Sequence, residues 1–125
     1  MGDARTLRAA KVDENQADIV AAMRANGVAV EITGMPLDLR IAKHMISIDV
    51  EVKNPRQIPS KRRLTDQEKD FYDRWHARGL ICVIETGEDV RELVAAMNVG
   101  LRATHAFCID NMEAHFAANY QRKRR

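Results

Sequence analysis

The chain has 125 residues, of which 46% are hydrophobic, 30% charged and 5% aromatic, and its formal net charge is +2. This length and balance predict a single globular domain over residues 1–125 and exclude collagen, coiled coils and disordered chains. No apolar run reaches the roughly 18–20 residues of a membrane span, so we expect no membrane partner. Because Cys82 and Cys108 both lie in apolar stretches, we expect buried free thiols in a reducing, intracellular compartment.

The first half of the chain predicts one helix followed by three strands. Hydrophobic residues at helical spacing, from Val12 onward, predict a helix over 14–26, with Asp13 as its cap. Strands are expected over 28–32, 37–42 and 45–53, with turns at 33–34 and 43–44. Turns this short imply an antiparallel meander. Residues 54–64 contain two prolines and no periodicity, which predicts a loop.

The second half predicts helices around one further strand. Thr65-Asp66-Gln67-Glu68 is a capping box that opens a helix ending near Gly79. The apolar run 80–84 predicts a buried central strand. Further helices are expected from the residue after Thr86 to residue 97, and over 101–121. We therefore expect an α/β (α+β) fold, a mixed sheet with helices on its faces, with its core over about 12–100 and a C-terminal helix and basic tail over 101–125.

Charged residues alternate along the third predicted strand. Asp49, Glu51 and Lys53 share one face, opposite an apolar face. Such a strand can simply be solvated on its outer side. Counting outward from the turn, however, places Asp38 opposite Glu51 or Lys53, so two carboxylates and a lysine are expected to meet at one edge of the sheet.

Two of the predicted helices carry a glutamine within their apolar stripe. Gln16 precedes the apolar residues of the first helix, and Gln67 lies between those of the second. An amide that faces a core needs hydrogen-bond partners, which a polar pocket would supply. Alternatively both glutamines lie at the stripe edges and reach water, and their spacing does not decide between the two. The four histidines are dispersed, so their spacing predicts no zinc site.

Asp38 followed by Glu51-Val52-Lys53, in the order helix, three strands, helix, strand, resembles the PD-(D/E)xK nuclease superfamily. It is most similar to the small VRR-NUC and Holliday-junction-resolvase-like nucleases of phages, over about residues 12–84 and the next helix. The resemblance implies a restriction-endonuclease-like core and metal-dependent hydrolysis of DNA phosphodiester bonds, with branched or junction DNA as one substrate class. It also implies the cytoplasm of a bacterial or phage-infected cell. The alternative is a catalytically inactive nucleic-acid-binding or assembly module on the same fold.

The resemblance also implies roles for individual residues. Asp38, Glu51 and the backbone carbonyl of Val52 would bind Mg²⁺, with Mn²⁺ as a substitute, and Lys53 would act on the attacking water or the phosphate. Independently, Mg²⁺ prefers oxygen ligands and keeps several waters, so two carboxylates suffice.

The two glutamines agree with the family pattern, whereas the spacing before Asp38 departs from it. Gln16 and Gln67 resemble helix glutamines that some members direct at the catalytic site. Leu37 separates Pro36 from Asp38, where the family often has Pro-Asp directly. This departure leaves Asp38 or Asp49 as the first metal ligand, and Asp38 is preferred because Asp49 lies further from the strand end.

The segment from 54 to 64 is basic and contains no acidic residue. It carries Arg56, Lys61, Arg62 and Arg63 immediately after the E-x-K motif, which favours contacts with a phosphate backbone over an ordinary solvated loop. The basic tail 121–125 can contribute similar contacts or be a solubilising end. Cutting two strands symmetrically would need a homodimer, for which 101–121 could form the interface. Packing of this helix on its own sheet is the alternative.

Overall fold

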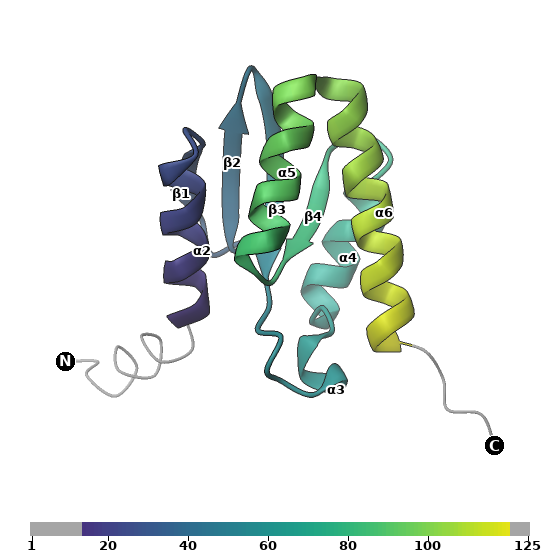
Figure 1. Ribbon diagram of the computed structural model, residues 1–125. Helices are drawn as coiled ribbons and strands as arrows, with labels where there is room; N and C mark the ends of the chain where they lie inside the picture. Colours follow the sequence, from purple (N-terminus) through teal and green to yellow (C-terminus); the bar gives the residue numbers. More distant parts are fainter. Residues whose placement is uncertain (1–13, 121–125) are drawn as a thin grey trace.

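The computed structural model describes residues 14–120 and shows a mixed α/β architecture (Figure 1). Val12, Asp13 and the basic tail 121–125 lie outside the described residues. The expected order of helices and strands is confirmed, with one additional short helix. The elements are α2 (Glu14–Ala25), β1 (Ala29–Ile32), β2 (Leu39–Lys43), β3 (Ile46–Val52), α3 (Pro59–Arg62), α4 (Asp66–Trp75), β4 (Ile81–Ile84), α5 (Gly87–Val99) and α6 (Leu101–Tyr120).

The four strands form one sheet in the order β1-β2-β3-β4. The first three pair antiparallel, as expected, and β4 pairs parallel with β3 after the crossover through α4. The prediction that residues 80–84 form a central strand is wrong, because β4 lies at the edge of the sheet. All four residues of β4 are apolar because helices cover both faces of this strand. The amide of Asn111 on α6 accepts from the Val83 N–H at 2.7 Å and donates to its carbonyl at 2.8 Å, which protects the exposed edge.

Helices pack on both faces of the sheet. One core, between the sheet and helices α2 and α5, includes Met23, Ile41, Val50 and Leu93. A second core on the opposite face joins β4 to α4 and α6 and includes Phe71. Because both faces are covered, Asp49 and Glu51 on the polar face of β3 are buried, and only Ser47 near its start is exposed.

Two local features, the β2–β3 turn and the segment 54–64, differ from the sequence prediction. The β2–β3 turn consists of His44 and Met45, both with positive φ (55° and 68°), because a two-residue hairpin loop favours the primed turn types. Part of the segment 54–64 folds into α3. Thr65 and Thr86 each cap a helix through a complete capping box. Both cysteines are buried free thiols, as expected.

Helix α6 packs against α5 and β4 within the same chain. Phe107 contacts the first core and Phe116 the second. This arrangement favours internal packing over a dimer interface as the role of the apolar residues of this helix. No helix within residues 14–120 combines the length and the hydrophobicity that crossing a membrane requires.

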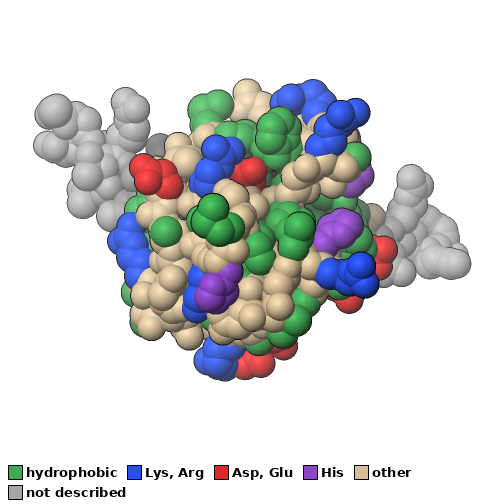
Figure 2. All heavy atoms as spheres, turned by 90° about the horizontal axis from the view of Figure 1, so that it is seen from above, with side chains coloured by type: hydrophobic (Ala, Val, Ile, Leu, Met, Phe, Trp, Pro, Cys, Tyr) green, Lys and Arg blue, Asp and Glu red, His purple; other side chains and the backbone are tan. Residues whose placement is uncertain are grey.

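Figure 2 shows the end of the molecule formed by the β2–β3 and α5–α6 turns. Hydrophobic side chains are interspersed there with Lys, Arg and His, and acidic side chains are scattered. Met45, Val99 and Leu101 are strongly exposed in these turns. The charged residues of the predicted site lie at the other end of the sheet, toward α3 in Figure 1.

Candidate active site

The carboxyl ends of β3 and β4 meet at one edge of the sheet because the two strands are parallel. Asn15 on α2 ties these ends together: its Nδ2 donates to the carbonyls of Lys53 at 2.9 Å and Glu85 at 3.2 Å. Helix α4 begins on the opposite face of the same edge. Segments far apart in the sequence therefore converge here.

Asp38 is held at this edge by the connection between β1 and β2. The N–H groups of Thr33 and Gly34 donate to its carbonyl at 2.9 and 3.1 Å. The Asp38 N–H donates to Oε1 of Glu51 at 3.2 Å, and the Val52 N–H donates to Oδ2 of Asp38 at 2.9 Å. This reciprocal pair continues the β2–β3 ladder beyond its last backbone pair, Leu39 and Val50. The expected pairing of Asp38 with Glu51 is confirmed.

Lys53 lies between two carboxylates. Its Nζ is 3.2 Å from Oε2 of Glu51 and 3.2 Å from Oε1 of Glu68. The same Glu68 oxygen accepts from the Thr65 N–H at 2.9 Å as part of the capping box. Sequence reasoning identified Glu68 only as a capping residue. Its position at the start of α4, directly after the loop from Lys53, was the available signal for a second role.

The cluster of Asp38, Glu51, Lys53 and Glu68 contains three carboxylates and one ammonium group. Burial, the Glu68 side chain and the Asp38 charge together raise the pKa of Glu51 to about 9, because the opposing charge of Lys53 is too small an effect to offset them. Burial also raises the pKa of Asp38. Without a cation the site therefore keeps a proton on Glu51.

The pKa values of Glu68 and Lys53 shift in the direction opposite to the effect of burial alone. Burial alone would raise the pKa of Glu68, but hydrogen bonds from Glu51 and the Thr65 backbone, together with the Lys53 charge, lower it. Burial alone would lower the pKa of Lys53, but the charges of Glu51 and Glu68 raise it. Glu68 and Lys53 thus form the ion pair, and Glu51 is the carboxylate left without a full counter-charge.

This imbalance is what a divalent cation would correct. Within residues 14–120, no three His, Cys, Asp or Glu side chains are arranged to hold a metal ion. Asp38 and Glu51 supply two adjacent carboxylates, and the Val52 carbonyl is on the backbone between Glu51 and Lys53. Because Mg²⁺ takes oxygen ligands and keeps several waters, this donor set fits it.

The two predicted glutamines do not join the cluster. Gln67 is exposed on α4, while its neighbour Glu68 points to Lys53. Gln16 is half-buried on α2, and its neighbour Asn15 contacts the strand ends. Neither glutamine side chain forms a hydrogen bond within residues 14–120. For Gln67, the structure therefore favours the alternative that its side chain lies at the edge of the apolar stripe and reaches water.

Asp49 is also placed away from the cluster. Its Oδ1 accepts from Nε of Arg40 at 3.1 Å and lies 3.0 Å from Nη2 of the same side chain. Arg40 is its direct cross-strand partner on β2. The structure brings Asp38, rather than Asp49, to Glu51.

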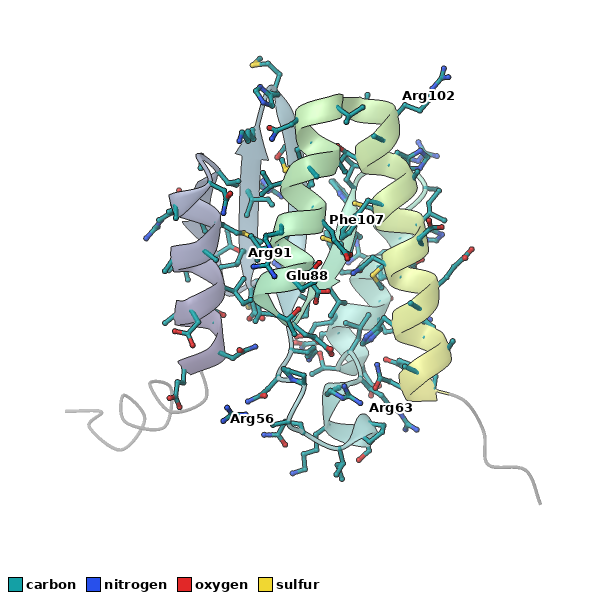
Figure 3. All side chains as sticks on the ribbon, in the orientation of Figure 1. Arg56, Arg63, Glu88, Arg91, Arg102 and Phe107 are labelled. Atoms are coloured by element: carbon teal, nitrogen blue, oxygen red, sulfur yellow. The ribbon has the colours of Figure 1, made fainter. Side chains whose placement is uncertain are left out.

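The four predicted nucleic-acid-binding residues fall into two pairs. Arg56 and Lys61 are exposed, and neither side chain has a partner within the described part of the chain. Arg62 lies 3.7 Å from Glu85, and Arg63 donates to the carbonyl of Asn119 at 2.7 Å. Figure 3 shows Arg56 and Arg63 beyond the strand ends, with Arg63 beside the end of α6.

Comparisons of the chain with protein-family models, with curated proteins and with solved structures gave no match. The geometry of the site is therefore the basis for assigning a function.

Proposed function

We propose that this protein is a metal-dependent endonuclease of the PD-(D/E)xK type, with a restriction-endonuclease-like core, that hydrolyses DNA phosphodiester bonds. The observation that carries the proposal is the convergence of Asp38, Glu51 and Lys53 at one strand edge, where buried carboxylates exceed the available positive charge. Purely structural ion pairs are usually balanced, and a perturbed carboxylate in such a cluster is typical of a functional site.

In this proposal Asp38, Glu51 and the Val52 carbonyl hold Mg²⁺ or Mn²⁺. When bound, the metal would lower the pKa of a coordinated water molecule and would compensate negative charge on the phosphoryl oxygens. Glu51 would release its proton to solvent and hold the metal as a carboxylate. Lys53 would then share the Glu51 carboxylate with the metal, and its ammonium group would stabilise negative charge on the phosphate.

Glu68 acts as a positioning residue for Lys53. It is fixed by the Thr65 capping box and so holds the ammonium group at the strand end. Arg56 and Lys61 contact the DNA backbone on the same side of the molecule. A homodimer would supply the second active site for symmetric cleavage, with an interface that does not use the buried residues of α6.

The direct test is cleavage by the purified protein on a panel of junction, flap, splayed, duplex and single-stranded DNA. We expect cleavage with Mg²⁺ or Mn²⁺ and none with EDTA. A matched set of RNA substrates tests the restriction to DNA. If the protein bound DNA but cleaved none of these substrates with any metal, it would be the alternative, an inactive binding module.

A further inference from the structure

A polar cavity of about 240 Å³ lies beside the candidate active site, between β4, α6 and the end of α3. Its lining includes Arg62, Glu85, His115, Ala118 and Asn119. Glu85 follows β4, just as Lys53 follows β3, and Asn15 holds the carbonyls of both. We call this space the α6 cavity.

Three polar atoms at the α6 cavity are buried and have no hydrogen-bond partner within residues 14–120: Arg62 Nε, His115 Nε2 and Asn119 Oδ1. His115 is 7% exposed and Asn119 is 4% exposed. Because buried polar atoms are normally paired, three orphaned atoms at one cavity point to a ligand or ordered water.

The hydrogen bonds already present define what these atoms can offer. Nδ2 of Asn119 donates to the His115 carbonyl at 2.9 Å and lies 3.1 Å from Nδ1 of His115. Nδ1 therefore accepts, and the proton of the neutral ring is assigned to Nε2. Burial, with smaller contributions from the Lys53 and Arg62 charges, lowers the pKa of His115 to about 4, so the ring is neutral at pH 7. The residues that line the cavity thus carry two unpaired donors, His115 Nε2 and Arg62 Nε, and one unpaired acceptor, Asn119 Oδ1.

The charge around the cavity disfavours a free anion. Arg62 is accompanied by two acidic residues, Glu85 and Asp89. The Asp89 carboxylate accepts from the Glu85 and Thr86 N–H groups at 2.8 and 3.2 Å, which fixes it in place. A neutral group that has both acceptor and donor atoms on one edge satisfies the donors of Arg62 and His115 and the acceptor of Asn119 at once. Nucleobase edges have this character.

We propose that the α6 cavity binds one unpaired nucleobase of the polynucleotide strand that enters the active site. At roughly 30 Å³ per water molecule, its volume corresponds to about eight waters, which suits one heterocycle and not a polypeptide segment. The inference rests on the proposed nuclease function and specifies its substrate: a strand with a base unstacked next to the scissile phosphate, as in a splayed or branched structure.

The test measures binding in EDTA, so that cleavage plays no part. A fluorescent single-stranded oligonucleotide is compared with the same oligonucleotide carrying a central run of abasic sites. Ala118→Leu fills the cavity from an exposed helix position and leaves every buried hydrogen bond in place. Ala117→Leu, at the next exposed position and outside the cavity lining, is the matched control.

We expect wild type and Ala117→Leu to bind the base-containing strand about tenfold more tightly than the abasic strand, the effect of two or three hydrogen bonds. Ala118→Leu should lose this preference and keep its affinity for the abasic strand. Asn119→Ala should weaken the preference as well, and its folding is checked by circular dichroism. Equal preference in wild type and Ala118→Leu would overturn the proposal and leave the cavity to water.

Free nucleosides separate this proposal from the nuclease function. Deoxyadenosine, deoxycytidine, deoxyguanosine and thymidine are titrated to millimolar concentration, with the Asn119 side-chain amide followed by NMR. Shifts that Ala118→Leu abolishes would support a base pocket. If the same protein cleaved no substrate, only the proposed reaction would be refuted. Metal-dependent cleavage with no dependence on Ala118 in any binding assay would refute the pocket alone.

Discussion

Two carboxylates on the same face of β3, two residues apart, have opposite surroundings. Asp49 pairs with one guanidinium group, that of Arg40 directly across on β2. Glu51 is more deeply buried and lies between Asp38 and Glu68, with Lys53 as the cation beside it. The first arrangement is charge-balanced, whereas the second is stable without metal only because Glu51 keeps its proton.

This difference separates a structural acid from a functional one. Arg40 is half exposed, so the Asp49 pair costs little to form and adds little. The Glu51 cluster holds buried charge that no described residue neutralises, which a protein tolerates where a ligand supplies the balance. Substitutions at the two sites should therefore have different effects.

The largest expected effect is the loss of cleavage in Glu51→Gln. Because substitution of groups behind metal ligands already costs about 10–100-fold, loss of a ligand should lower the rate more than about a hundredfold. DNA binding in EDTA should persist, since without metal the protonated Glu51 and its glutamine replacement are both neutral. Asp38→Asn should behave alike in quantitative cleavage and gel-shift assays.

Asp49→Asn is the matched control on the same strand. It should retain cleavage within severalfold and cost no more than about 1 kcal/mol of stability, because the ion pair with half-exposed Arg40 contributes little. If Asp49→Asn abolished cleavage while Asp38→Asn did not, Asp49 would be the metal ligand and the comparison would be reversed.

The next effect concerns the shared lysine. Lys53→Ala should lower the cleavage rate by about 10²–10³-fold, the usual cost of removing a group that stabilises transition-state charge. Its affinity for Mg²⁺, measured by calorimetry, should stay close to wild type or increase. Glu68→Gln should reduce the rate less than Lys53→Ala, because it only releases the ammonium group. A Glu68→Gln effect as large as that of Glu51→Gln would indicate that Glu68 is itself a ligand.

The unpaired Glu51 also predicts how stability depends on pH. Its pKa rises from 4.5 in the unfolded chain to about 9 in the fold, so between these values the folded state binds more protons. The free energy of unfolding should therefore fall as pH rises from about 5 to 9 in EDTA. In Glu51→Gln this contribution disappears, and the difference between the two proteins isolates it from other titrating groups such as His115. Denaturant unfolding at several pH values measures both curves.

Mg²⁺ should counteract this loss of stability. Free metal at 100 times its dissociation constant adds about 2.7 kcal/mol, which raises the wild-type melting temperature by several degrees. The gain should be greatest at alkaline pH, where the metal displaces no proton, and absent in Glu51→Gln. Equal stabilisation of both proteins would place the cation elsewhere.

The sequence was sufficient for all elements except the short helix α3 because their signals are local. The capping box at Thr65 and the alternation around Glu51 depend on neighbours along the chain. Register then follows from the hairpin, so the pairing of Asp38 with Glu51 could be counted. The edge position of β4 could not, since it depends on which strand the crossover joins.

The rest of the site depends on side chains that meet only in three dimensions. Helical spacing directed attention to Gln16 and Gln67, but their neighbours Asn15 and Glu68 make the contacts. Adjacent helix positions are about 100° apart, so shifting the expected inward-facing position by a single residue exchanges one for the other. The α6 cavity has no sequence signal because it joins α3, β4 and α6.

The smallest expected effect distinguishes the two pairs of basic residues beyond the strand ends. Arg56 and Lys61 are exposed and have no described partners, whereas Arg62 and Arg63 are held by Glu85 and Asn119. Arg56→Ala/Lys61→Ala should leave the melting temperature unchanged and flatten the salt dependence of duplex binding. Two fewer phosphate contacts reduce the slope of log K against log[salt] by about 1.8.

Arg63→Ala provides the contrast. It removes the contact with the Asn119 carbonyl and the stacking of the guanidinium on the Tyr120 ring, 5.3 Å from its centroid. The melting temperature should therefore fall, since one hydrogen bond and one cation–π contact together contribute about 1–2 kcal/mol. The salt slope should change by less than in the double variant, because this side chain is already engaged within the protein. A double variant with the wild-type slope, beside an Arg63→Ala protein with a flattened one, would mean that DNA displaces Arg63 from α6 and that the structural contact is the binding contact.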